Sequence, residues 1–399
     1  MTTDPPAPPA PPAPSGTPAP ASSSDAPDRS SAPGSSAPGA LNLALLRDRN
    51  DAAVLRAVRA AGDGTSRVEL AVRTGLTAQA ISKITARLLA DGLLTEAGRS
   101  HVAGRSGKPR TLLRLVPDAR SALGAEIGRR ELQLLRTDLT GAVVARARTP
   151  IDPDGEPGPI LDRLAAMVRE LTADTADTAA TAATPGTGGG RVLGLGLACP
   201  GPLDTRDGIL HQVTGMPRWH GLHLREAVQD RTGLPVLVEK NTTAGVLSRP
   251  GSDHRAFVYL GDGVGAGLVL GGRVQRGART NAGEFGHQCL APDGPPCACG
   301  ARGCLEALCL AALRTGRTDR AAAALALGVA NLVRLLDVEE VVLGGATLLA
   351  DPEPYEAAIR EALAARLPDP HWQHVTLTRA TALAVPQGAA ALALSRLFG

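Results

Sequence analysis

The chain has 399 residues, of which 43% are hydrophobic and only 2% aromatic, and its formal net charge is +3. This length allows more than one domain, and the composition predicts a large core built from Ala, Val, Leu and Ile. No apolar run approaches the roughly 20 residues of a membrane span, and the N-terminus lacks a signal-peptide pattern. These observations exclude a membrane protein and predict a cytoplasmic chain, in which cysteines stay reduced.

Two segments have low sequence complexity. Residues 1–40 are almost entirely Pro, Ala, Ser, Gly and Thr. Such a tail cannot bury enough apolar surface to offset its ordering entropy, so we expect it to be disordered. A second run, at 172–190, is expected to be a loop inserted into a later domain.

Basic charge is concentrated in the segment that follows the tail. Residues 41–115 carry 13 Lys or Arg and 6 Asp or Glu, a net charge of +7, which leaves −4 for the rest of the chain. A basic module on a mildly acidic body favours a nucleic-acid partner for the first part only. A charged surface without a partner is the alternative.

Three helices and a β-hairpin are predicted within 41–116. The first helix has Asn50 as its expected N-cap. The second opens with a capping box, in which Ser66 caps the helix and Glu69 follows three residues later. The third starts after Thr77, which has the side chain of a typical N-cap. This order of elements is that of a winged helix-turn-helix.

The third helix is the predicted DNA-recognition element. Ile81, Ile84 and Leu88 share one buried face, which leaves the opposite face free for a major groove. A small helical bundle for protein contacts is the alternative, with the same polar side chains merely solvated. The predicted DNA contacts are Thr77, Gln79, Ser82 and Lys83 on this helix, Arg87 at a phosphate, and Arg105, Lys108 and Arg110 in the wing.

From residue 117 to 399, predicted strands and helices alternate. Apolar strands that end in Gly-rich turns are typical of an α/β fold that binds a ligand at those turns. Three consecutive strands are expected at 122–128, 132–139 and 142–151, a helix at 158–173, and further strands within 191–203, 233–241, 254–274 and 338–346.

Four of the six cysteines fall between 283 and 306. One imidazole and three thiolates suit a closed, tetrahedral, structural zinc site, and the intervening Pro and Gly allow the loop to fold around an ion. Free core cysteines are the alternative, and a redox role is disfavoured because there is no CxxC pair. Cys289 and Cys309 lie outside the spacing and are interpreted as ordinary thiols. The predicted ligands are His287, Cys297, Cys299 and Cys304.

The stretch "LGDGVGAGLVLGGRVQRGARTNAGEFGH" (260–287), followed by "CACGARGCLE" (297–306), resembles the ROK family of bacterial sugar-responsive repressors and sugar kinases. The resemblance covers roughly 45–399 and implies a two-lobed, actin-like ATPase fold. It places the family's zinc ligands on the four residues already predicted. It implies a ligand-binding set of Lys240, Asn241, Glu284, His287 and Glu306.

Departures from the family's kinase pattern argue against phosphoryl transfer. The general-base Asp of the kinases is Asn241 here, which cannot accept a proton, and loss of a general base costs about 10²–10⁴ in rate. The first phosphate loop carries Arg129 and Arg130 in place of small residues. The second carries Asp262, whose carboxylate would repel a phosphate. Only "LGGA" at 343–346, near the family's adenosine site, matches.

Lys240 replaces an Asn that contacts sugar in the family. One hypothesis is that its ammonium reaches the carboxylate of Glu284 or Glu306, or selects an anionic sugar. The other is that the pocket has decayed and the lysine fills it.

Together these features predict a non-enzymatic, DNA-binding transcriptional regulator, a repressor of carbohydrate genes. It would bind a palindromic double-stranded operator as a homodimer, contain structural zinc and sense a sugar or sugar derivative. The alternatives are an ATP-dependent sugar kinase with an appended DNA-binding domain, and a ligand-independent DNA-binding dimer.

Overall fold

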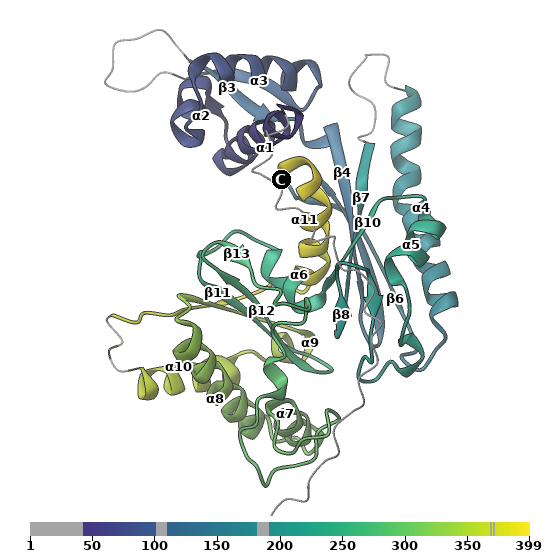
Figure 1. The fold of residues 1–399 in the computed structure, drawn as a ribbon, viewed down its shortest axis with the longest axis vertical. Coiled ribbons are helices and arrows are strands. Elements are labelled where there is room, and N and C mark those ends of the chain that lie inside the picture. The colour runs from purple at the N-terminus through teal and green to yellow at the C-terminus, as the bar shows by residue number, and fades with distance from the viewer. Residues whose placement is uncertain (1–42, 101–109, 182–190, 368, 370–371) are drawn as a thin grey trace, which may run out of the picture. The chain divides into compact units, whose positions relative to one another are not determined.

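The computed structural model describes residues 43–100, 110–181, 191–367, 369 and 372–399 (Figure 1). Residues 46–399 form one compact unit. The predicted disordered tail and the predicted wing contacts Arg105 and Lys108 lie outside the described residues. None of the described helices is long and apolar enough to cross a membrane.

The first part of the described chain is a three-helix domain with a three-stranded sheet of order β1-β3-β2. Both strand pairs are antiparallel, so β2 and β3 form the hairpin that the sequence predicted. The elements are α1 (Leu43–Ala61), β1 (Thr65–Ser66), α2 (Arg67–Thr74), α3 (Ala78–Ala90), β2 (Leu94–Ser100) and β3 (Arg110–Leu115).

Two of the three predicted helix starts are confirmed. The Ser66 side chain accepts from the Glu69 backbone N–H while the Glu69 carboxylate accepts from Ser66, which completes the capping box. Thr77 Oγ1 accepts from the Ala80 N–H at 3.2 Å and caps α3. The prediction for Asn50 was wrong, because the preceding Leu and Ala residues are strong helix formers and α1 already begins at Leu43.

The first lobe of the body is built on a five-stranded sheet of order β10-β7-β4-β5-β6. β4, β5 and β6 form an antiparallel meander, and β7 and β10 add in parallel. Helices α4 and α5 pack on one face and α11 on the other (Figure 1). The bounds are β4 (Arg120–Ile127), β5 (Glu131–Asp138), β6 (Val143–Pro150), β7 (Arg191–Cys199), β10 (Val236–Lys240), α4 (Pro157–Thr181), α5 (Leu224–Thr232) and α11 (Ala384–Phe398).

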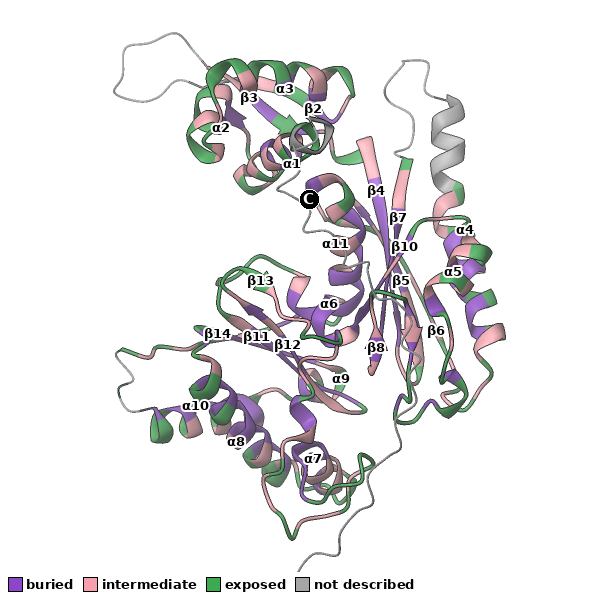
Figure 2. Ribbon diagram, viewed as in Figure 1, coloured by how far each residue is buried: buried purple, intermediate pink, exposed green. Residues whose placement is uncertain are grey.

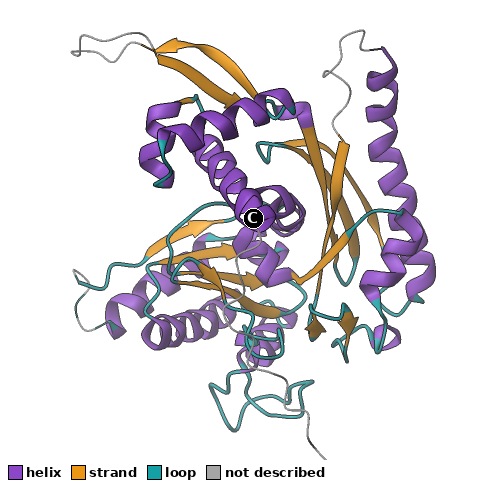
Figure 3. Ribbon diagram, turned by 45° about the horizontal axis from the view of Figure 1, so that its top comes forward, coloured by secondary structure: helices purple, strands orange, loops and turns teal. Residues whose placement is uncertain are grey.

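The second lobe has its own five-stranded sheet, of order β13-β12-β11-β14-β15. Helices α8 and α10 pack together on one face, with α7 beside α8, and α6 contacts the other face (Figure 3). The bounds are β11 (Arg255–Leu260), β12 (Val264–Leu270), β13 (Arg273–Val274), β14 (Glu340–Gly344), β15 (Thr376–Arg379), α6 (Asn241–Leu247), α7 (Leu305–Arg314), α8 (Thr318–Leu336), α9 (Ala346–Ala350) and α10 (Glu353–Arg366).

Short elements complete the body: the 3₁₀ turns Pro117–Ala119, Pro217–Trp219 and Phe285–His287, and the hairpin of β8 (Leu203–Asp204) and β9 (Ile209–Leu210). The three consecutive strands predicted from 122 to 151 are confirmed as β4, β5 and β6. The prediction of a loop at 172–190 was wrong in part, because α4 continues to Thr181. The Ala-rich sequence favours helix, and the first Pro of this stretch comes only at position 185.

Helices α6 and α11 pack against each other, and their residues are largely buried (Figure 2). Glycines allow this close packing. A Cβ on Gly196 of β7 would lie 1.8 Å from the Ala389 carbonyl oxygen, and a Cβ on Gly388 would lie 1.6 Å from the Ala244 carbonyl oxygen. No side chain fits at either contact. This packing fixes the first turn of α6, which carries Asn241, beside the end of β10.

Candidate functional site

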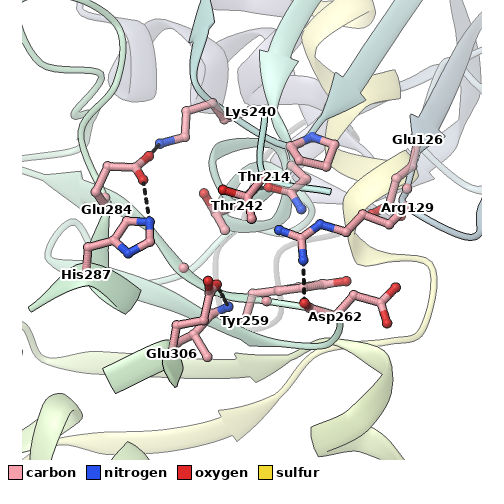
Figure 4. Close-up of a pocket in the computed structure, with 18 residues that line it drawn as sticks. Glu126, Arg129, Thr214, Lys240, Thr242, Tyr259, Asp262, Glu284, His287 and Glu306 are labelled. Carbon is pink, nitrogen blue, oxygen red and sulfur yellow. Dashed lines mark hydrogen bonds and ion pairs between the residues drawn. The ribbon is translucent and has the colours of Figure 1, made fainter. Parts of the chain in front are cut away.

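A cavity of about 90 Å³ lies between the first and second lobes and is called the central cavity here. It has room for several water molecules, each of which needs about 10–15 Å³. The two phosphate-loop positions that the sequence singled out, Arg129 and Asp262, lie at its wall (Figure 4). All five residues predicted to bind ligand also line it: Lys240, Asn241, Glu284, His287 and Glu306.

Chain geometry explains this convergence. Lys240 ends β10 and Asn241 begins α6, so both lie at the edge where the parallel strands of the first lobe finish. The turn from Phe285 to His287 and the first turn of α7, which carries Glu306, face them from the second lobe. Asn241 Oδ1 accepts from the Thr242 N–H at 2.8 Å, within the first turn of α6.

Lys240 lies at one side of the central cavity and reaches Glu284 (Figure 4). Its Nζ donates to Glu284 Oε1 at 2.5 Å, to the Ala282 carbonyl oxygen at 3.1 Å and to Asn281 Oδ1 at 3.3 Å. The Lys240 side chain is 4% exposed, whereas that of Glu284 is 38% exposed. The ammonium is therefore buried and held by acceptors from the opposite lobe.

A second ion pair joins the lobes next to the first. Glu239 is 2% exposed, and its carboxylate accepts from Arg276 Nε at 2.6 Å. Burial raises the pKa of Glu239, and the Arg276 charge opposes that shift. Neither Arg276 nor Asn281 was predicted. A buried carboxylate implies a partner, but the sequence does not say which residue supplies it.

Protein groups also fill the phosphate-loop end of the central cavity. Arg129 Nη1 donates to the Asp262 carbonyl oxygen at 2.5 Å, and the Asp262 carboxylate lies 3.4 Å from Arg130 Nε. Glu306 Oε2 accepts from the Val264 N–H at 2.8 Å. A Cβ on Gly263 would lie 2.8 Å from Glu306 Oε2 and 3.3 Å from an Arg129 nitrogen. The backbone of this loop is thus covered by side chains of the same chain.

Glu126 lies buried at the same end. Burial, and to a smaller extent the charge of Glu131, raises the pKa of Glu126 from 4.5 to about 7. Burial and the charge of Glu126 also raise the pKa of Tyr259, another residue that lines the central cavity.

Thr242 contributes an unsatisfied polar group to the wall. Its hydroxyl oxygen is buried and has no hydrogen-bond partner among the described residues. A hydroxyl in that position costs stability unless water or a ligand bonds to it.

The predicted metal ligands form one cluster. The ligand atoms of His287, Cys297, Cys299 and Cys304 all lie within 4.8 Å of one another. His287 Nδ1 is 3.6 Å from Cys297 Sγ, and Cys299 Sγ is 3.6 Å from Cys304 Sγ. Two sulfurs bound to one tetrahedral zinc at about 2.3 Å lie about 3.8 Å apart, so the donor set and spacing fit zinc.

His287 also connects this cluster to the central cavity. Its other ring nitrogen, Nε2, faces Glu284 Oε2 at 3.8 Å (Figure 4). A carboxylate beside the second ring nitrogen is a common way of orienting a metal-bound histidine. Cys289 is exposed and Cys309 is buried, and neither belongs to the cluster.

Helix α3 exposes the polar face that the sequence predicted. Gln79, Ser82 and Lys83 are exposed, while Ile81, Ile84 and Leu88 are buried. Within the described residues, no hydrogen bond or ion pair engages the side chain of Gln79 or Lys83. The Ser82 hydroxyl donates to the Ala78 carbonyl oxygen at 2.9 Å.

Arg87 and Arg110 are placed differently from these three residues. Arg87 forms an ion pair with Asp51 of α1, and both side chains are partly buried. This pairing favours a structural role for Arg87 over the predicted phosphate contact. Arg110 begins β3 and is half-buried. A partner carboxylate for Arg87 on another helix could not be read from the sequence.

Two family models match the chain. The MarR family model matches residues 48–106, which contain most of α1 and all of α2 and α3, and the ROK family model matches residues 122–318. In solved structures, the chain is similar to a ROK family transcriptional regulator described as a homolog of the E. coli MLC protein. The TM-score is 0.70 at 23% identity, and the match covers 88% of this chain and 97% of that one. These matches confirm the predicted resemblance and fold.

Two curated relatives illustrate the range of the similarity. A putative xylose repressor from Caldicellulosiruptor sp. is 28% identical over 271 residues, which is 66% of this chain and 64% of that protein. A glucokinase from Thermotoga maritima is 37% identical over 120 residues, which is 29% of this chain and 38% of that enzyme. The chain therefore spans less than two thirds of the length of either relative.

Proposed function

We propose that this chain, which carries a ROK family body behind a MarR-type winged helix, is a DNA-binding transcriptional regulator that represses carbohydrate genes. The observation that carries the proposal is the exposed polar face of α3, whose Gln79 and Lys83 have no partner among the described residues. A helix with such a face fits a major groove. The similarity to a putative xylose repressor supports the carbohydrate assignment.

DNA would be bound by a homodimer on a palindromic operator, with one α3 in each half-site. Thr77, Gln79, Ser82 and Lys83 would contact base edges and nearby phosphates. Arg110 would contribute from the start of β3, together with Arg105 and Lys108 of the wing. Arg87 would act indirectly, since its bond to Asp51 holds α3 against α1.

The body would be an effector domain, residues 117–399, that has lost phosphoryl transfer. An Asn at position 241 offers no base for a sugar hydroxyl. The contact from Arg129 to the Asp262 backbone leaves the phosphate loops covered by protein groups. Glu284, His287 and Glu306 would remain as the ligand-facing residues of the central cavity.

Zinc would be held by His287, Cys297, Cys299 and Cys304. A closed four-ligand site supplies folding free energy rather than catalysis. It would brace the loop that presents Glu284 to Lys240.

The competing function is a sugar kinase with an appended DNA-binding domain. The local similarity to a glucokinase supports this alternative. One experiment separates the two. The full-length protein is incubated with ATP, Mg²⁺ and a panel of hexoses and pentoses, and ADP release is measured beside genome-wide mapping of DNA-binding sites. We expect discrete binding sites near carbohydrate genes and no sugar-dependent ADP release. Turnover that disappears on Glu284→Gln substitution would contradict the proposal.

A further inference from the structure

The ammonium of Lys240 has no hydrogen-bond donor left for a ligand. A lysine offers three N–H donors. All three meet acceptors from one segment of the second lobe: Glu284, the Ala282 carbonyl and Asn281. The stem packs beside the backbone of Gly201, where a Cβ would lie only 2.9 Å from Lys240 Cε.

The contact between Lys240 and Glu284 also occupies an acceptor, Glu284 Oε1, in the wall of the central cavity. A neutral sugar binds through hydroxyl groups, which need acceptors such as a carboxylate. Glu284 Oε2 lies 3.8 Å from His287 Nε2, beyond hydrogen-bond distance, whereas Glu284 Oε1 already accepts from the Lys240 ammonium at 2.5 Å. A charge-assisted bond of this length is stronger than the bond a sugar hydroxyl would make. A neutral sugar would therefore have to displace a better partner.

The charges around the central cavity do not favour an anionic ligand either. Its wall contains four carboxylates, and its two cationic side chains, Arg129 and Lys240, are both bound to protein acceptors. An added anion would find both cations already engaged and carboxylates beside it. The predicted reach of the Lys240 ammonium to Glu284 is confirmed, and the charges favour a lysine that fills the pocket over one that recruits an anionic sugar. The four carboxylates are Glu126, Asp262, Glu284 and Glu306.

We propose that Lys240 is an internal ligand of the central cavity and sets its specificity by excluding neutral monosaccharides. The lysine takes the position and the acceptors that a sugar would use. The hydroxyl of Thr242, another residue of the wall, is buried and has no partner among the described residues. The inference rests on the proposed function only in treating this cavity as the effector site.

The test is to shorten Lys240 and measure sugar binding directly. In Lys240→Asn, the ammonium is lost, Glu284 is released, and the new amide can both donate to and accept from a sugar hydroxyl. Binding of D-glucose and of D-xylose to the full-length protein is measured by titration calorimetry. We expect at least about a tenfold gain in affinity for one of these sugars over the wild-type protein, because one released hydrogen-bond acceptor is worth about that much.

The matched control is Lys240→Arg, which keeps a cation beside Glu284 and is expected to bind neither sugar. Thermal unfolding and DNA binding are measured on each variant, and Lys240→Gln, which keeps more of the stem, replaces Lys240→Asn if the latter does not fold. Equal affinity in the wild-type protein and the variant would overturn the proposal, as would a folded variant that binds no sugar. DNA binding that persists in either case leaves the proposed regulator function intact.

Discussion

The chain contains three lysines, and the two that the structure describes, Lys83 and Lys240, have opposite surroundings. Lys83 is exposed on α3 and has no partner among the described residues. Lys240 is buried, and three acceptors satisfy its ammonium. A polar group that the fold leaves unengaged is available to an outside partner, whereas a saturated group is not.

The same contrast holds for the regions around these two lysines. Gln79 lies near Lys83 and is equally free, so α3 presents a face that other molecules can satisfy. In the central cavity, Arg129 is bound to Asp262 and Glu306 to Val264. Polar side chains of the winged helix are therefore open to an outside partner, whereas those of the central cavity are engaged within the protein.

The largest expected effect comes from a substitution in the predicted metal-ligand cluster next to the central cavity. Cys299→Ser should abolish zinc binding, because it removes one of four ligands. Zinc-finger peptides gain on the order of 10 kcal/mol from their metal, so the substitution should lower the melting temperature strongly. Zinc content by mass spectrometry and thermal unfolding measure both results. Lys240 should also become accessible to amine reagents, since the loop carrying Glu284 loses its brace.

Cys289→Ser is the matched control, because Cys289 is also exposed but lies outside the cluster. It should keep the zinc content and melting temperature of the wild-type protein. Equal loss of zinc in both variants, or full zinc retention in Cys299→Ser, would contradict the assigned ligand set.

A smaller effect should come from Glu126, at the other end of the central cavity. Its pKa is raised to about 7 from 4.5, so the folded state binds this proton more tightly than the unfolded state does. The resulting stability is fully present below pH 4.5 and is lost as the pH rises through about 7. The Glu126→Gln variant cannot ionise at this position and so does not lose this stability at high pH. The free energy of unfolding of the variant at pH 8 should exceed the wild-type value by up to about 3 kcal/mol.

Urea unfolding of both proteins between pH 5 and 8 measures this difference. The gap should widen with rising pH and be small at the acid end. A gap that stays constant or narrows would mean that Glu126 is not neutral in the folded protein.

Substitutions on α3 test whether its exposed polar side chains bind DNA. Gln79→Ala should cost about 1–3 kcal/mol of operator binding and relax the base preference at one position. Lys83→Ala should weaken binding to all sequences and reduce the salt dependence of log K by about 0.9 if Lys83 contacts a phosphate. Fluorescence anisotropy at several salt concentrations distinguishes the two outcomes.

Arg87→Ala provides the contrast within the same helix. Because Arg87 is paired with Asp51, its loss should lower the free energy of unfolding by roughly 1 kcal/mol and leave the salt dependence unchanged. If the salt dependence of log K for DNA binding were reduced in this variant, Arg87 would contact a phosphate, as the sequence predicted.

Local signals explain what could be predicted from the sequence. The capping box at Ser66 and the N-cap at Thr77 depend on residues a few positions apart, and the structure contains both. The predicted metal ligands, His287, Cys297, Cys299 and Cys304, also lie within one short stretch of the chain, so the spacing of these residues was informative. The family resemblance supplied the distant members of the cavity, such as Lys240, which local patterns could not have joined to Glu284.

Partners set by tertiary packing could not be predicted. Arg276 meets Glu239, and Arg87 meets Asp51, across elements whose relative placement no local pattern encodes. The extension of α4 to Thr181 was missed for another reason. Low complexity indicates a loop, whereas the Ala content of that stretch favours helix.

The most direct test of the central contrast is the reactivity of the two lysines toward an acetylating reagent, measured by mass spectrometry on the full-length protein. DNA recovered by genome-wide mapping is added in one sample, and D-glucose or D-xylose in another. We predict that Lys83 reacts readily and is protected by the DNA, while Lys240 stays unreactive in every sample. Unchanged Lys83 reactivity on bound DNA, or a reactive Lys240 that sugar protects, would contradict the account.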